Sequence, residues 1–219
     1  MQLITENPDQ SFYNMNNVFQ IDGNLNISIL EESFAYLINR HDILRTCFHK
    51  TGEQFERRVF DKVTWKLNYL DISQSDNKTM PELKSRIDSI INQKIPYTQA
   101  PMLAASIIKI SKECYIFVVS ISHLIIDGTS AGIIFSEISH CYNQMINNKA
   151  LDLPEVVLQS KEYSKKRSQI DIRFHQPTDI ETPVFPFDFE NSASNDTEYQ
   201  MISHTISEKQ MLSLKEIAK

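Results

Sequence analysis

Short apolar runs alternate with stretches whose apolar residues recur every three or four positions over the first 150 residues. The runs predict strands, and the wider spacing predicts helices with one buried face. Strands are expected at 18–21 and 65–71, and strand hairpins at 44–60 and 102–122. Helices are expected at 26–40, at 80–94 after the N-cap Thr79, and at 130–147. This order predicts an α/β (α+β) fold, in which both hairpins share one mixed sheet flanked by helices.

The pattern changes after Asn148. Residues 155–170 predict a helix, whereas residues 171–197 lack periodicity and contain several prolines and a polar run. Such a composition is typical of a linker or a crossing loop. A strand is expected at 198–206, and Ser207 is expected to cap a last helix.

Composition narrows the class of protein. The 219 residues are 41% hydrophobic and 23% charged, which is ordinary for one large or two small globular domains. The net charge of −6 argues against nucleic acid as a partner, and no apolar run reaches the roughly 18–20 residues of a membrane span. The three cysteines lack zinc-site spacing and are interpreted as reduced core residues. We therefore expect a cytoplasmic protein that binds no membrane.

One segment carries candidate chemistry. An apolar strand-like run ends at Ser122, and His123 follows it, four residues before Asp127 and Gly128. Histidine takes up and returns a proton near neutral pH. The segment resembles the HHxxxDG motif of condensation domains of nonribosomal peptide synthetases. Its HxxxDG core also marks the wider superfamily that includes chloramphenicol acetyltransferase, and here Ser122 replaces the first histidine.

A second segment supports this resemblance. Residues 39–48, Asn-Arg-His-Asp-Ile-Leu-Arg-Thr-Cys-Phe, are similar to the RHxxLRTxF motif of the same family and precede the histidine motif. Residues 13–15 and 21–26 resemble the first strand of the family and its turn into the first long helix. The resemblance implies a chloramphenicol acetyltransferase-like lobe, the first of two that form a V.

Both ends look truncated against the family. The opening motif is absent, and residues 162–166 match a later YxDYAVW-like motif poorly. We therefore expect the N-terminal lobe at 1–170, a linker or crossing loop at 171–197, and the start of a truncated second lobe at 198–219.

The resemblance assigns His123 as the catalytic residue. It would position or deprotonate an attacking amine, or stabilise the tetrahedral oxyanion. The alternative is a strand-end histidine bonded to a backbone carbonyl. Asp127 is expected to be a structural carboxylate paired with an arginine rather than to orient His123 as in a triad. The resemblance implies that this arginine comes from the RHxxLRTxF-like segment, where Arg40 and Arg45 are the candidates and Arg40 is preferred.

The residues after Asp127 are expected to support the site. Gly128 would provide a positive φ or allow a substrate arm to approach the backbone, with a plain turn glycine as the alternative. Ser130 is expected to be a helix N-cap, with Thr129 as the competitor. The other five histidines lack ligand spacing, so no metal site is expected.

The function that the resemblance implies is amide-bond formation between two carrier-tethered thioesters, an acyl donor and an aminoacyl acceptor. The partners would be peptidyl or acyl carrier proteins, which carry phosphopantetheine, and neighbouring synthetase modules. No cofactor would be bound directly, because the thioester is already activated. Alternatives are a coenzyme A-dependent acyltransferase, an epimerisation domain and a non-catalytic carrier-docking lobe. This chain alone is expected to be inactive or nearly so.

Overall fold

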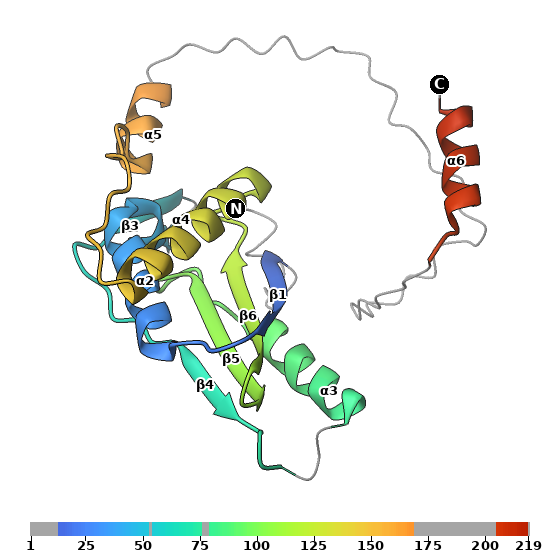
Figure 1. Cartoon of the computed structure of the whole chain (residues 1–219). Coiled ribbons are helices and arrows are strands. Elements are labelled where there is room, and N and C mark those ends of the chain that lie inside the picture. Colours follow the sequence, from blue (N-terminus) through green and yellow to red (C-terminus); the bar gives the residue numbers. More distant parts are fainter. Residues whose placement is uncertain (1–12, 53, 76–78, 169–204, 219) are drawn as a thin grey trace. The chain divides into compact units, whose positions relative to one another are not determined.

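The computed structural model describes residues 13–52, 54–75, 79–168 and 205–218. The chain divides into two compact units, residues 1–172 and 173–219. Within the described ranges, the first unit contains β1 (Asn14–Asp22), α2 (Ile27–Arg40), the 3-10 helix η2 (Asp42–Arg45), β2 (Thr46–Thr51), β3 (Gln54–Val59), β4 (Asn68–Asp71), α3 (Met80–Ile91), β5 (Leu103–Ser111), β6 (Cys114–Ser122), α4 (Gly128–Ile146) and α5 (Ser160–Ser168) (Figure 1). The second unit contains α6 (Glu208–Ile217).

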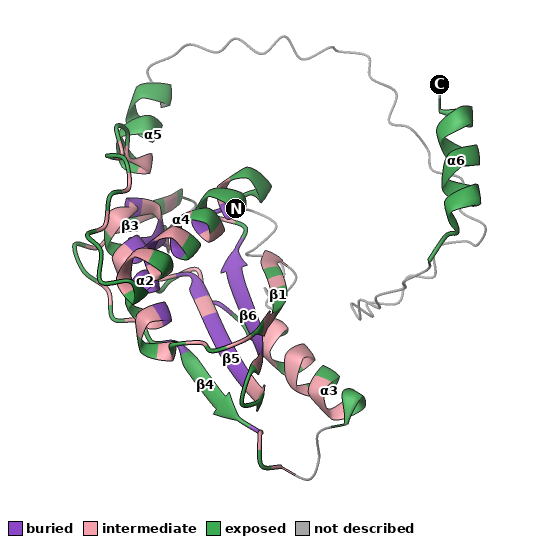
Figure 2. Ribbon diagram, in the orientation of Figure 1, coloured by how far each residue is buried: buried purple, intermediate pink, exposed green. Residues whose placement is uncertain are grey.

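Four strands form the main sheet, in the order β1-β6-β5-β4. Strand β6 is antiparallel to both β1 and β5, whereas β4 runs parallel to β5. The mixed sheet flanked by helices is therefore confirmed, and so is the hairpin expected at 102–122. Burial is concentrated in the central strands β5 and β6, and the edge strand β4 is exposed (Figure 2).

Helices cover both faces of the sheet. Alternate side chains of β6 point to opposite faces, as a pleated strand requires. One set joins the larger core, together with buried residues of α2 and α4: Tyr115, Phe117, Val119 and Ile121. Ile116 and Val118 join a smaller core with the apolar residues of α3. Strand β6 is apolar throughout its middle because both of its faces are covered.

Side chains fix the start of each long helix. Asn26 Oδ1 accepts a hydrogen bond from Ile29 N at 3.1 Å, and Thr79 Oγ1 accepts one from Glu82 N at 3.4 Å. Such caps satisfy backbone donors that the first helical turn leaves free. The helices expected at 26–40 and 80–94 are confirmed, as is Thr79 as the N-cap. Ser207 and Gln210 form a reciprocal capping box at α6.

The two hairpins do not share a sheet, so that expectation is wrong. Strands β2 and β3 form a separate two-stranded sheet. The 3-10 helix η2 occupies residues 42–45, where the hairpin was expected to begin, and it turns the chain after α2. Backbone bonds tie this hairpin to its surroundings: Phe48 N of β2 donates to Tyr97 O at 2.8 Å, and Phe60 N, just after β3, donates to Arg45 O of η2 at 3.0 Å.

Some sequence expectations remain untested. Residues 169–204 lie outside the described residues, and they contain the expected linker and nearly all of the strand expected at 198–206. The boundaries expected for the three parts of the chain therefore stay predictions. In the described part of the chain, no helix combines the length and apolar character that a membrane span requires.

Two neighbouring isoleucines of α4 test which face of this helix stabilises the lobe. Ile134 is 7% exposed in the main core, whereas Ile133 is 52% exposed. We predict that Ile134→Ala lowers the free energy of unfolding by about 2–4 kcal/mol, because it leaves a cavity. Ile133→Ala, the same substitution in the same helix, should change it by less than about 0.5 kcal/mol. Urea unfolding followed by circular dichroism measures both, and equal effects would contradict the assigned face.

Candidate active site

His123 follows the last residue of β6. Its backbone N–H donates to Tyr13 O at 2.7 Å, which extends the β1–β6 pairing by one hydrogen bond. The residue is exposed, and among the bonds of the described residues none uses its imidazole ring. The sheet therefore fixes the backbone of His123 and leaves the ring accessible.

Ser122 holds the start of the turn that carries His123. It is 4% exposed, and its backbone N–H donates to Met102 O at 3.0 Å. Its hydroxyl accepts from Leu124 N at 3.5 Å, and its carbonyl accepts from Ile125 N at 3.1 Å. The serine that replaces the first histidine of the motif thus serves in packing and hydrogen bonding.

Asp127 is the N-cap of α4. Its Oδ1 accepts from Ser130 N at 2.8 Å and from Ser130 Oγ at 2.6 Å. These bonds favour the charged carboxylate, so the bonds from Ser130 hold the pKa of Asp127 below its ordinary value, with a smaller contribution from the nearby His123.

Asp127 forms no ion pair with Arg40 or Arg45, both of which the structure describes, so that expectation is wrong. Arg40 Nε lies 3.4 Å from Glu137 Oε2, and Arg40 Nη2 donates to Pro154 O. Arg45 Nε donates to Phe60 O at 3.4 Å. The carboxylate of Asp127 instead accepts from the amide and the hydroxyl of Ser130, because the first turn of a helix leaves backbone donors free.

The expectations for Ser130 and for a positive φ at Gly128 are also corrected. Ser130 lies inside α4 and donates to the cap, so it is not the cap itself. Gly128 is the first residue of α4, and its φ lies outside the left-handed region. Apart from its chain neighbours and the backbone of its own helix, no atom of the described residues lies within 4 Å of the place where a Cβ of Gly128 would be, which leaves room for a ligand to approach.

A second cluster surrounds Asp42, which sequence reasoning did not single out. Asp42 is 7% exposed, and its carboxylate accepts from Ser160 N at 3.0 Å and from Lys161 N at 2.9 Å. It therefore caps α5 from 118 residues away in the sequence. Arg57 Nη2 lies 3.8 Å from Asp42 Oδ1 and donates to Ser160 Oγ at 3.1 Å. No local sequence signal links positions this far apart.

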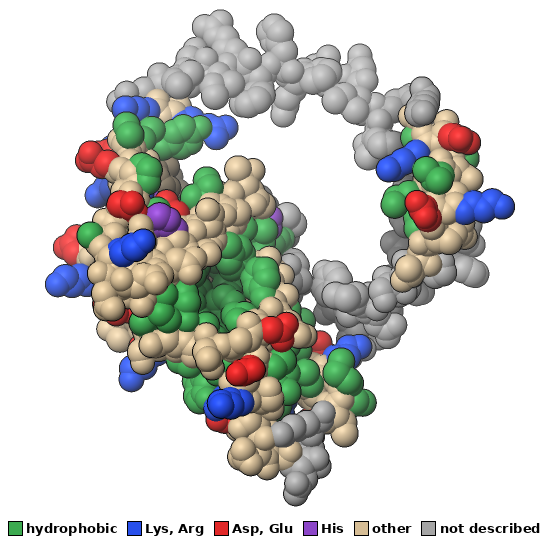
Figure 3. All heavy atoms as spheres, in the orientation of Figure 1, with side chains coloured by type: hydrophobic (Ala, Val, Ile, Leu, Met, Phe, Trp, Pro, Cys, Tyr) green, Lys and Arg blue, Asp and Glu red, His purple; other side chains and the backbone are tan. Residues whose placement is uncertain are grey.

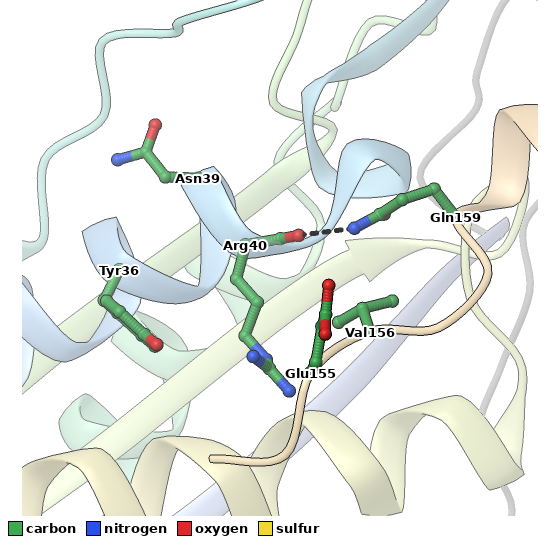
Figure 4. A pocket seen from close by; sticks show the side chains of 6 residues that line it. All are labelled: Tyr36, Asn39, Arg40, Glu155, Val156 and Gln159. Carbon is green, nitrogen blue, oxygen red and sulfur yellow. Dashed lines mark hydrogen bonds between the residues drawn. The ribbon is translucent and has the colours of Figure 1, made fainter. Parts of the chain in front are cut away.

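A pocket of about 440 Å³ lies beside this cluster, between α2 and the segment before α5. Its walls are mostly polar and are formed by Tyr36, Asn39, Arg40, Glu155, Val156 and Gln159. Gln159 Nε2 donates to Arg40 O at 2.9 Å, and the Arg40 side chain extends toward the segment with Glu155 (Figure 4). Of the site residues expected from the sequence, Arg40 alone lines this pocket. The pocket is therefore distinct from the segment around His123.

Comparison with known proteins identifies the family. The family model of the condensation domain matches residues 2–179 of this sequence. The chain belongs to the condensation-domain family. It is 29% identical over 157 residues to bacitracin synthase 1 of Bacillus licheniformis, covering 71% of this chain and 3% of that protein. It is 29% identical over 152 residues to gramicidin S synthase 2 of Aneurinibacillus migulanus, covering 69% of this chain and 3% of that protein.

Solved condensation domains have the same fold. The starter condensation domain of rhizomide synthetase superposes with a TM-score of 0.66 at 17% identity, covering 77% of this chain and 41% of that chain. The first condensation domain of the calcium-dependent antibiotic synthetase superposes with a TM-score of 0.65 at 15% identity, covering 76% and 40%. This condensation-domain chain thus spans less than half of either solved chain.

The cap predicts how replacement of Asp127 affects stability. Asp127→Ala should lower the melting temperature by about 2–5 °C, whereas Asp127→Asn should retain most of it, since asparagine caps helices about as well. The pKa of Asp127 is lowered in the folded state, so the part of its stabilisation that depends on the charge is complete above the pKa of the unfolded chain. That part is lost as the pH falls through the pKa of the folded state. The difference between the native chain and Asp127→Ala should therefore shrink below about pH 4.

Thermal unfolding between pH 3 and pH 7 measures this effect. Asp61→Ala is the control, because Asp61 is exposed and caps no helix. If Asp127→Asn were as damaging as Asp127→Ala, the capping role would be wrong.

Proposed function

We propose that this lobe supplies the first half of a site that joins an acyl group to an amine. The observation that carries the proposal is the placement of His123: a fixed backbone at the end of β6 and an exposed ring, within the family motif. Its relatives are peptide synthetases, which supports amide-bond formation in nonribosomal peptide synthesis.

In the proposed reaction the acceptor amine attacks the carbonyl carbon of the donor thioester. The C–N bond forms, the C–S bond breaks, and the donor thiol leaves with a proton. His123 would act in one of two ways, by taking the proton of the amine or by donating a hydrogen bond to the tetrahedral oxyanion. The thioester is already activated, so this chemistry requires no cofactor bound to the lobe.

Both substrates would arrive on phosphopantetheine arms of peptidyl or acyl carrier proteins from neighbouring synthetase modules.

A second lobe would close over His123, and we propose that it packs against the apolar surface beside β1. Apolar side chains gather in a hollow between α4 and β1 (Figure 3). Phe19 of β1 is 39% exposed, and its ring centroid lies 5.1 Å from that of Phe135 of α4. An exposed apolar patch of this kind is typical of a surface that another domain covers.

A condensation assay tests the proposal. The 219-residue chain should form little or no amide from a loaded donor carrier and a loaded acceptor carrier, because half a site loses near-attack positioning. The same chain followed by the second lobe of a related condensation domain should form the product. In that longer chain, His123→Ala should slow product formation about a hundredfold or more.

The controls separate this activity from the alternatives. His140→Ala is the matched variant, because His140 is a half-buried histidine of α4 whose side chain is 41% exposed and bonds to Asp152, away from the motif. Carrier docking, measured by native mass spectrometry, should be unchanged in His123→Ala. If the longer chain transferred the acyl group from coenzyme A as fast as from a loaded carrier, the alternative of a coenzyme A-dependent acyltransferase would be favoured. Unchanged product formation by His123→Ala would leave the lobe as a docking scaffold.

A further inference from the structure

Two consecutive side chains at the end of α2 meet one carboxylate of α4. Arg40 Nε lies 3.4 Å from Glu137 Oε2, and His41 Nε2 lies 2.6 Å from the same oxygen. Arg40 is the last residue of α2, and His41 is its C-cap. Two residues of the RHxxLRTxF-like segment thus contact α4 through Glu137.

This cluster is largely withdrawn from water. The side chains of Arg40, His41 and Glu137 are 12%, 18% and 15% exposed. Arg40 Nε is buried without a hydrogen bond, and among the described residues the Glu137 carboxylate is the acidic group within ion-pair distance of this guanidinium. The carbonyl end of α2 carries a partial negative charge, which favours cations here and disfavours an isolated carboxylate. Removal of the Glu137 charge therefore strands a buried cation, a costly change.

Helix α4 connects this cluster to the candidate catalytic histidine. Glu137 lies nine residues after Gly128, about 13–14 Å along the helix axis. The first turn of α4 is bonded to Asp127 by Ser130 N at 2.8 Å and by Ala131 N at 2.8 Å. The turn from His123 to Asp127 ends in this cap. A shift or rotation of α4 would therefore move the turn that carries His123.

We propose that Glu137 is a positioning residue for His123. Arg40 and His41 hold Glu137, Glu137 fixes α4 against α2, and α4 fixes the turn after β6. In this chain the arginine of the RHxxLRTxF-like segment acts through Glu137 and not through Asp127. The catalytic meaning of this role rests on the function proposed above for His123, whereas the mechanical link can be measured without substrate.

Native-state hydrogen exchange on the 219-residue chain tests the link. Glu137→Gln removes the charge and keeps the shape of the side chain. We expect the amides of His123, Ile125, Ser130 and Ala131 to exchange about tenfold faster in this variant, because this turn opens locally. Amides within the β5–β6 pairing should change by less than about twofold. The ring cross-peak of His123, assigned by its loss in His123→Ala, should also move in the carbon–proton NMR spectrum.

Two further variants make the outcome decisive. Glu137→Asp keeps the charge and should restore part of the protection, which a role in packing alone would not explain. Glu32→Gln is the matched control in α2, where Glu32 is exposed, and it should leave the four amides and the His123 cross-peak unchanged. Equal acceleration of all amides in Glu137→Gln would mean loss of global stability alone and would overturn the proposal, as would no change. If exchange behaves as expected but His123→Ala retains condensation activity, the proposed function fails and the mechanical link stands.

Discussion

Strand β6 is paired along both edges and covered on both faces, and the placement of the candidate site follows from that constraint. Antiparallel pairing with β1 and with β5 fixes its register over nine residues. Its alternating side chains belong to two different cores, so a slip by one residue would exchange the two sets. The end of the strand is therefore as well defined as its middle. His123 takes its backbone position from this strand, while its ring lies beyond the cover of the helices.

The segment after β6 passes from strand to helix within five residues, and local hydrogen bonds fix the change. Ser122 closes the turn through its hydroxyl and carbonyl groups, and Asp127 closes it by capping α4. The motif therefore combines an exposed histidine with two residues, Ser122 and Asp127, that hydrogen-bond to neighbouring residues of the same turn. Asp127 therefore acts on the conformation of the turn, by capping α4. In the described part of the chain it makes no bond to the ring of His123.

Periodicity predicted α2 and α4 because each of these helices buries one face. The hairpin of β5 and β6 was predicted from its apolar runs, because β6 is covered on both faces. The long α4 and the apolar β6 are recognisable from residue spacing alone. Asp127 directly before Gly-Thr-Ser was also a local N-cap signal, and it was available from the sequence. The prediction of an arginine partner for Asp127 overlooked the backbone amides of the helix that follows it directly in the chain. The spacing of three residues from Asp127 to Ser130 was sufficient to identify the Ser130 amide as the donor.

Other contacts had no local signal. Glu137 pairs with His41 across 96 residues, and Asp42 caps α5 across 118 residues. Both carboxylates lie in segments that look like ordinary helix or turn sequence, and only the packing of α2 on α4 and of α5 on η2 brings their partners close. The assignment of the two hairpins to one sheet failed for a similar reason, since strand patterns specify faces but not neighbours. In this lobe, therefore, the spacing of residues determines the elements. Partly buried charges between distant segments add contacts that the spacing does not reveal, from α2 to α4 through Glu137 and from η2 to α5 through Asp42.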